Sequence, residues 1–286
     1  TKENVTKRTQ LEKFSKKFIC TKFNDELIDL KKPLQQDGEL IFLDFNDPLA
    51  KKAFWHTSSH ILAQAVKRLY PKALPAIGPS IDEGFYYDFD NLKIGEEDFL
   101  KIEKEMQKIV SENLEIIHEY IDKKELSKLF KDEKYKLEIL NEIEDDKVST
   151  YKQGDYIEIC RGPHLPSTGF VKAIKLTKLA GAYWKGDSAN PMLTRIYGVS
   201  FPEEKLLKEY LALIEEAKKR DHKKIGAEME LFDIKEEGPG FPFFLPKGVL
   251  LWNALMDFWR EEHRIAGYQE IKTPIILSRA LWERSG

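Results

Sequence analysis

The spacing of apolar residues predicts a helix over residues 47–70. Asp47 followed by Pro48 is typical of an N-cap and a first helical residue, and a proline ends the pattern. His56 and His60 lie four residues apart in this helix, so both imidazoles are expected on one face. The apolar positions recur at helical spacing: Leu49, Ala53, Ile61, Ala65, Val66 and Leu69.

Shorter elements are predicted on both sides of this helix. Before it, two β-type runs at 26–30 and 39–43 surround a turn, as in the closing half of a small β-rich module. After it, apolar periodicity predicts helices over 96–113 and 123–131. Alternating or aromatic runs predict strands at 84–89, 114–120, 135–140, 155–160, 173–179, 181–184 and 192–197.

The last third of the chain has a different pattern. Ser200 and Glu203 form a capping-box signature, and the helix that they open is predicted to continue to about Lys224. Basic residues gather at its far end, where a solvated face favoured by the helix dipole is a simpler interpretation than a nucleic-acid contact. Beyond a Gly-Pro-Gly break, the pattern predicts an apolar helix over 249–266 and an extended strand over 268–276. Pro274 within that strand favours an edge or an interface.

These elements predict a multidomain α+β protein. The 286 residues allow one to three domains, and the composition is ordinary, with 42% hydrophobic and 33% charged residues and a net charge of −3. Two distant cysteines, Cys20 and Cys160, argue against a disulfide framework and favour a reducing compartment. The sequence has no apolar run of bilayer length and no signal peptide, so a cytoplasmic protein without membrane contact is expected.

Candidate chemistry is concentrated in two segments about a hundred residues apart. His56 and His60 share a helix face, and Cys160 and His164 flank a Gly-Pro turn. Three imidazoles and a thiol form a set suited to metal binding or to hydrolysis by a positioned water. A histidine pair on a helix is more often structural, but the second pair of ligand-type residues favours a functional site.

Several short blocks follow one another in a fixed order along the chain. They are HTSSH at 56–60, AIGP at 76–79, GFYYD at 84–88, CRGPH at 160–164, GAYWKGDS at 181–188, RIYG at 195–198 and KRDHKKIG at 219–226. From about residue 22 onward this series resembles the bacterial-type threonyl-tRNA synthetases. The two histidines together with the Cys-x-x-x-His turn resemble the editing domains that threonyl- and alanyl-tRNA synthetases share.

The resemblance implies a division into four parts. Residues 1–46 are expected to end a β-grasp-like TGS module, 47–200 to form an α+β editing domain, 201–225 a linker helix, and 226–286 the start of a class II antiparallel-sheet aminoacylation domain. The helix at 249–266 and the strand through Pro274 resemble class II motif 1, which forms the homodimer interface in the family. The chain begins with Thr, as a processed product or a fragment does, and stops before motifs 2 and 3, so it is not expected to activate threonine.

The resemblance also implies roles for the candidate residues. An aminoacylation pocket that accepts threonine excludes serine weakly, because one methyl group is worth only about 1–3 kcal/mol, and a second site hydrolyses the wrong ester. His56, His60, Cys160 and His164, together with Lys136, are the expected catalytic residues. Glu158 is expected to bind the seryl amino group. The family has Asp at this position, so the extra methylene of Glu158 puts that recognition in doubt.

Two interpretations of the His/Cys cluster follow from the family. In alanyl relatives the corresponding residues hold zinc, whereas the threonyl enzymes are expected to edit without a metal. The metal-free interpretation is favoured here, with a zinc site at His56, His60, Cys160 and His164 as its rival. The aromatic residues Trp184, Tyr86, Tyr87 and Phe89 are expected in the core rather than as base-stacking platforms.

The predicted function is therefore that of a portion of a threonine–tRNA ligase that carries the editing site for seryl-tRNA(Thr). In the intact parent, the partners and cofactors would be tRNA(Thr), threonine, Mg-ATP and a zinc ion whose ligands lie outside this chain. Two alternatives remain: a free-standing trans-editing hydrolase, which has no use for motif 1, and a non-catalytic tRNA-binding or dimerisation scaffold.

Overall fold

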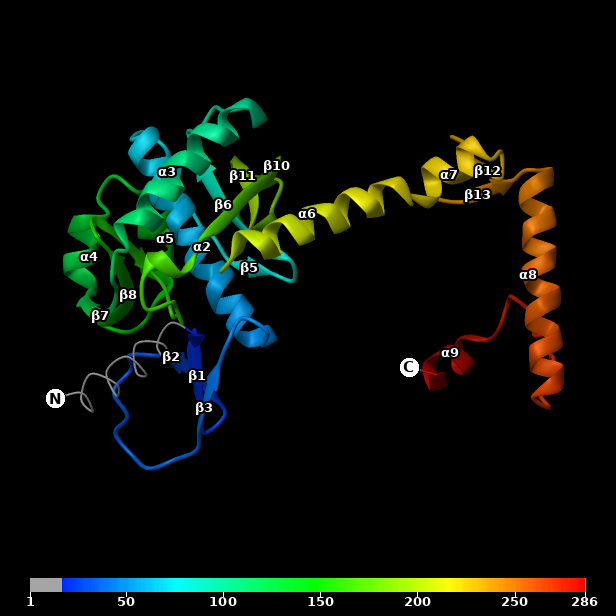
Figure 1. The fold of residues 1–286 in the computed structure, drawn as a ribbon, viewed down its shortest axis with the longest axis horizontal. Coiled ribbons are helices and arrows are strands. Elements are labelled where there is room, and N and C mark those ends of the chain that lie inside the picture. Colours follow the sequence, from blue (N-terminus) through cyan, green and yellow to red (C-terminus); the bar gives the residue numbers. More distant parts are fainter. Residues whose placement is uncertain (1–16, 286) are drawn as a thin grey trace. The chain divides into compact units, whose positions relative to one another are not determined.

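The structure, a computed structural model, describes residues 17–285. The expectation for residues 1–16, the first part of the predicted TGS-like module, lies outside the described residues. By its contacts the chain forms two compact units, which divide between Leu211 and Ala212. The first unit contains three sheets around the helix that carries the two histidines (Figure 1).

The described N-terminal residues form a small antiparallel sheet in the strand order β2-β1-β3. A two-residue turn joins its first two strands, and both turn residues, Asn24 and Asp25, have positive φ as a tight hairpin turn requires. This confirms the β-rich character predicted for this segment. The strands are β1 (Cys20–Phe23), β2 (Glu26–Asp29) and β3 (Leu40–Leu43).

Helix α2 (Pro48–Leu69) is the centre of the first unit. Its N-cap is the predicted one, because the Asp47 carboxylate accepts hydrogen bonds from the main-chain N–H groups of Leu49 and Ala50. The helix is buried from Ala53 through Val66 except at His56, which is half-buried, and it packs on α3 (Phe99–Glu112). Short 3-10 turns lie at Glu96–Asp98, Thr168–Phe170 and Trp184–Gly186.

Two further antiparallel sheets complete the first unit. The larger has the order β10-β11-β6-β4, with β5 paired to β6, and the smaller has the order β7-β8-β9. The strands predicted at 173–179 and 181–184 are one strand, β10, bent by a bulge between Leu176 and Lys178. The remaining elements are β4 (Leu74–Pro75), β5 (Ser80–Ile81), β6 (Gly84–Asp90), β7 (Ile116–Asp122), α4 (Lys123–Leu129), β8 (Lys147–Gln153), β9 (Tyr156–Ile159), β10 (Ala173–Tyr183) and β11 (Met192–Phe201).

The strand predicted at residues 135–140 is wrong. Residues 135–140 belong to a helix, α5 (Lys134–Glu142), and not to a strand. The alternation of Tyr135, Leu137 and Ile139 imitates a strand, but the helix buries Lys136 and Leu140, which are four residues apart. A hydrophobicity pattern counts the buried Lys136 as a polar residue, so the sequence did not show the helical spacing of the buried positions.

The predicted linker helix also differs from the structure. Ser200 is no cap, because β11 continues through Phe201, and helix α6 (Glu204–Lys219) begins only afterwards. The helix ends before Lys224 because Asp221 starts a new one, α7 (His222–Glu228), accepting a hydrogen bond from the N–H of Lys223.

The second unit consists of short elements and one long helix, α8 (Pro246–Ile265), which confirms the helix predicted at 249–266. The other elements are the end of α6, the helix α7, and β12 (Phe232–Ile234), β13 (Pro242–Phe244) and α9 (Arg279–Ser285). The strand predicted over 268–276 is absent; these residues have no regular structure. Among the described helices, none combines the length and the apolar character needed to cross a bilayer.

The aromatic predictions are mostly confirmed. Tyr87, Phe89 and Trp184 are buried. Tyr86 is half-buried, and the Arg195 guanidinium lies over its ring at 3.7 Å from the centroid. Arg195 in turn makes a two-pronged ion pair with the buried Asp88, which joins the neighbouring inner strands β11 and β6.

Candidate functional site

The first half of the candidate site is a face of α2. His56 and His60 lie one helical turn apart, with ring centroids 4.9 Å from each other. Next to them, the Ser59 hydroxyl donates to the carbonyls of His56 and Gly78. Gly78 is required at this point, because a Cβ there would lie 2.0 Å from the Tyr87 ring. The AIGP block therefore fits closely against the helix that presents the histidines.

The second half is the turn after β9. Cys160 follows the last residue of the strand, and its N–H donates to the Ser149 carbonyl at 3.1 Å. Gly162 has a φ of +71°, and a Cβ at this position would lie 2.1 Å from the Tyr151 hydroxyl, so glycine is needed for both reasons. The Gly162–Pro163 peptide bond is cis. The turn directs Cys160 and His164 towards α2.

The two halves meet as the sequence predicted. The His164 ring lies 4.4 Å from His56 and 4.3 Å from His60, measured between centroids. Cys160 Sγ lies 3.4 Å from His56 Nε2 and 3.2 Å from His164 Nε2. One ligand-type atom from each of the four residues lies within 4.8 Å of the others. Residues from two segments a hundred positions apart thus form one cluster.

Thr57 sets the orientation of His164. Its hydroxyl lies 3.0 Å from His164 Nδ1 and donates its proton to the Ala53 carbonyl, also at 3.0 Å. With that proton engaged, the Thr57 oxygen accepts from Nδ1–H of His164 and from the main-chain N–H of Leu165. Nε2 of His164 then has a free lone pair that faces Cys160 Sγ, as a base or a metal ligand requires.

The cluster is uncharged at neutral pH. Burial lowers the pKa of His56 to about 4 and the pKa values of His60 and His164 well below their usual value, with the neighbouring histidines adding to the shift for the latter two. Burial raises the pKa of the Cys160 thiol to about 11. Three neutral imidazoles therefore surround a protonated thiol.

This donor set fits a zinc ion. Zinc prefers four nitrogen and sulfur ligands in a tetrahedron, which places neighbouring ligand atoms about 3.4–3.6 Å apart. The two Cys160–histidine distances, 3.2 and 3.4 Å, are close to that spacing. The same atoms also suit a metal-free site, in which neutral imidazoles accept a proton from water. The geometry is compatible with both interpretations that the sequence left open.

Lys136 and Glu158 lie in a polar network beside the cluster rather than within it. The Lys136 ammonium pairs with Glu158 Oε1 and donates to the Tyr87 hydroxyl at 2.9 Å and to the Ala76 carbonyl at 3.3 Å. Glu158 Oε2 accepts from the hydroxyls of Tyr87 and Tyr156, at 2.6 and 2.7 Å. Burial lowers the pKa of Lys136. Both predicted residues are thus fully engaged with protein partners.

Sequence reasoning missed several residues of this region. Thr57 belongs to the HTSSH block, but its role in orienting His164 depends on the turn after β9, about a hundred residues away. Tyr151 lies on β8, a strand that the sequence analysis did not predict. Tyr156 and Tyr87 read as ordinary aromatic strand residues, and only their contacts with Glu158 distinguish them.

Comparison with known proteins agrees with the motif order. A family model described as "Threonyl and Alanyl tRNA synthetase second additional domain" matches residues 148–197, which include Cys160 and His164. The threonine–tRNA ligase of Caldanaerobacter subterraneus subsp. tengcongensis is 55% identical over 279 residues, which is 96% of this chain and 43% of that protein. By sequence, this chain is a relative of the threonine–tRNA ligases.

Other threonine–tRNA ligases give the same result. That of Carboxydothermus hydrogenoformans is 52% identical over 292 residues (99% of this chain, 46% of that protein). That of Clostridium tetani is 55% identical over 275 residues (95% of this chain, 43% of that protein). The chain therefore spans less than half the length of these curated threonine–tRNA ligases, and it corresponds to a portion of such an enzyme.

Proposed function

We propose that this chain carries the editing site of a threonine–tRNA ligase and hydrolyses the ester bond of seryl-tRNA(Thr). The observation that supports this most is the convergence of His56, His60, His164 and Cys160 within 4.8 Å. Hydrolysis of an ester needs a positioned water, a proton acceptor at neutral pH and donors for the oxyanion. The neutral imidazoles of the cluster supply the acceptor.

The residues divide into two groups in this proposal. His164, whose Nε2 lone pair faces the cluster, and His56 accept the proton from water, while His60 and Cys160 shape the pocket around it. Glu158 binds the seryl amino group and Lys136 supports it. Because Lys136 already pairs with Glu158, the incoming ammonium has to share this carboxylate with the lysine.

The direct test is deacylation of seryl-tRNA(Thr) and threonyl-tRNA(Thr) by this chain. Selective loss of serine is expected, and the double variant His56→Ala, His60→Ala is expected to abolish it without unfolding the protein. His222→Ala, at an exposed position in α7, is the matched control and should retain full activity. Unchanged deacylation in the double variant would refute the assignment.

A zinc-dependent form of the same site is the second candidate, and the donor set of the cluster supports it. When bound by these residues, zinc would supply Lewis-acid chemistry at the ester. Deacylation in the presence of a chelator separates the two forms. Activity that survives chelation supports the metal-free site, and activity that is lost and returns with added zinc supports the zinc site.

The wider assignment concerns a longer protein. We infer an intact cytoplasmic ligase that attaches threonine to tRNA(Thr) with Mg-ATP, with a zinc ion in an aminoacylation domain whose ligands are not in this chain. Its homodimer contact would use the motif 1 region. Helix α8 presents apolar side chains to solvent there: Leu250, Leu251, Trp252, Leu255, Phe258 and Trp259. If the chain binds tRNA without deacylating it, a non-catalytic scaffold is the better description; a monomer with full activity would favour a free-standing hydrolase.

A further inference from the structure

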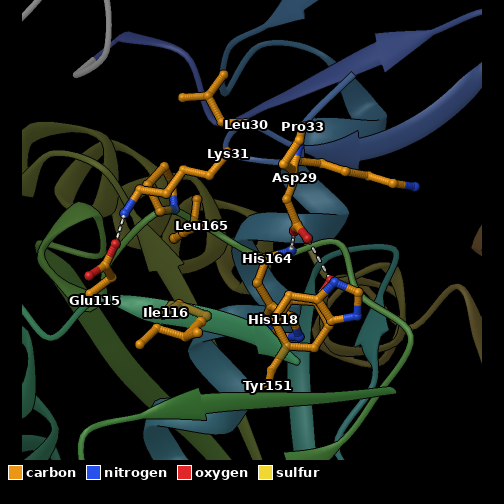
Figure 2. Close-up of a pocket in the computed structure, with 13 residues that line it drawn as sticks. Asp29, Leu30, Lys31, Pro33, Glu115, Ile116, His118, Tyr151, His164 and Leu165 are labelled. Atoms are coloured by element: carbon orange, nitrogen blue, oxygen red, sulfur yellow. Dashed lines mark hydrogen bonds and ion pairs between the residues drawn. The ribbon is translucent and has the colours of Figure 1, made fainter. Parts of the chain in front are cut away.

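Asp29, the last residue of β2, connects the N-terminal sheet to the candidate site. Its Oδ1 accepts from the main-chain N–H of His164 at 2.7 Å, and its Oδ2 accepts from the Tyr151 hydroxyl at 2.6 Å. Figure 2 shows both bonds, with Asp29 above the Tyr151 ring and the His164 backbone. Neither bond belongs to the regular pairing of a sheet, and both are charge-assisted.

The pairing of β2 with β1 fixes the position of Asp29. Asp29 pairs with Cys20 in the antiparallel register of β1 and β2, and Cys20 is fully buried. The carboxylate projects into a cavity of about 240 Å³, which is also lined by His118, Tyr151 and His164. A paired strand of the N-terminal sheet therefore holds a carboxylate in the lining of a cavity that adjoins the predicted catalytic turn.

Tyr151 is the second partner and forms a wall behind His164. Its ring lies 4.4 Å from the His164 ring and stacks on His118 at 4.6 Å with an interplanar angle of 16°. Its hydroxyl occupies the space that a Cβ at Gly162 would need. Tyr151 thus packs against both the imidazole of His164 and the turn that carries it.

His164 is consequently held at both ends. Thr57 fixes Nδ1 of its imidazole, while Asp29 fixes its main chain and, through Tyr151, the face of its ring. We propose that Asp29 is a positioning residue for the deacylation reaction: the N-terminal sheet sets the placement of His164 through the Asp29 carboxylate. This inference rests on the proposed editing function.

The test compares Asp29→Leu with Asp29→Asn in this chain. Leucine has a similar size but accepts no hydrogen bond, whereas the asparagine oxygen still accepts from His164 N–H and its amide donates to the Tyr151 oxygen. We expect Asp29→Leu to lower kcat for seryl-tRNA(Thr) about tenfold or more with an unchanged KM, because small misplacements of reacting groups are costly. Asp29→Asn is expected to keep most of the wild-type kcat. Asp25→Asn, in the exposed turn of the same sheet, is the control and should behave as the wild type.

A second variant covers the case in which Asp29→Leu does not fold. Tyr151→Phe removes one of the two bonds and leaves the ring in place, so kcat is expected to fall about three- to tenfold. Three results would overturn the proposal. The first is a folded Asp29→Leu variant with normal kcat, and the second is an Asp29→Leu variant in which only KM changes. The third is a kcat of Asp29→Asn that is no higher than that of Asp29→Leu.

NMR spectroscopy tests the position of His164 without an activity assay. In ¹H–¹⁵N spectra, the His164 amide proton should lie downfield in the wild type and in Asp25→Asn, and move upfield in Asp29→Leu. If the wild type has no deacylase activity, the proposed function fails, and this resonance still decides whether Asp29 holds the turn. An unchanged His164 resonance in Asp29→Leu would refute the contact itself.

Discussion

Lys136 and Glu158 form an ion pair that is almost completely withdrawn from solvent, with relative exposures of 1% and 4%. Tyr87 and Tyr156 complete the hydrogen bonding of the carboxylate. A buried pair of this kind adds little stability compared with apolar residues, but the loss of one partner leaves the other charge without compensation. The pair therefore makes the region sensitive to single substitutions.

Replacing Glu158 with Gln is expected to destabilise the first unit by about 3–5 kcal/mol, because Lys136 then loses its counter-charge in a buried site. Urea unfolding followed by circular dichroism measures this change. Glu209→Gln is the matched control: Glu209 pairs with Lys205 on the exposed face of α6, so its replacement should change the free energy of unfolding by less than about 1 kcal/mol. Equal effects of the two substitutions would contradict the buried pair.

Glu158→Asp tests the length of this side chain. The shorter carboxylate cannot reach Lys136, Tyr87 and Tyr156 together, and losing these contacts is expected to destabilise the unit by about 1–3 kcal/mol. The same variant reports on substrate recognition, since the threonyl family is expected to have Asp here. A change of the KM for seryl-tRNA(Thr) in either direction would assign Glu158 to amino-group binding, and an unchanged KM would count against that role.

The histidine cluster predicts a loss of stability in acid. The folded-state pKa values of His56, His60 and His164 are lowered, that of His56 to about 4, so below pH 6.5 the unfolded chain binds more protons than the folded one. Each such histidine then lowers the stability by up to about 1.4 kcal/mol per pH unit as the pH falls towards 4. Unfolding midpoints at pH 7 and pH 5 should show this slope, and His56→Gln should reduce it where the exposed His222→Gln does not.

Zinc binding to the cluster predicts a defined proton release. The three imidazoles are neutral at pH 7, but the pKa of the Cys160 thiol is raised to about 11, so coordination has to displace one proton, from sulfur. Calorimetry in two buffers of different ionisation enthalpy measures the number released, which is expected to be one per zinc and zero for Cys160→Ser. No zinc binding in this titration would support metal-free hydrolysis.

Gly162→Ala is expected to destabilise the protein by about 1–3 kcal/mol through backbone strain and a collision. The φ of Gly162 is +71°, and its added Cβ would meet the Tyr151 hydroxyl at 2.1 Å. Gly186 offers a matched control, because its φ is +73° and a Cβ there meets nothing within 4 Å. The difference in unfolding free energy between the two alanine variants isolates the collision, and equal values would exclude it.

Local sequence was enough to predict the central helix and its cap, because Asp47, Pro48 and the apolar spacing all indicate the same start. It was also enough to predict that His56, His60, Cys160 and His164 form one cluster, since each segment contributes a pair of residues suited to metal binding or proton transfer. It failed at Lys136 and Ser200. A lysine buried by a distant glutamate looks exposed in a periodic pattern, and a strand that extends to pair with β10 overrides a capping signature.

The Asp29 contact has a consequence for the order in which the protein forms. The hydrogen bond to His164 joins residues 135 positions apart, and Thr57 and His164 are separated by 107. Contacts between such distant residues form slowly, because a long loop must close before they stabilise anything. The β1–β2 hairpin and α2 rely on neighbouring residues and can form while the chain is still being synthesised. The geometry of the His/Cys cluster is thus expected to be among the last features to appear during folding, after the ribosome has passed residue 165.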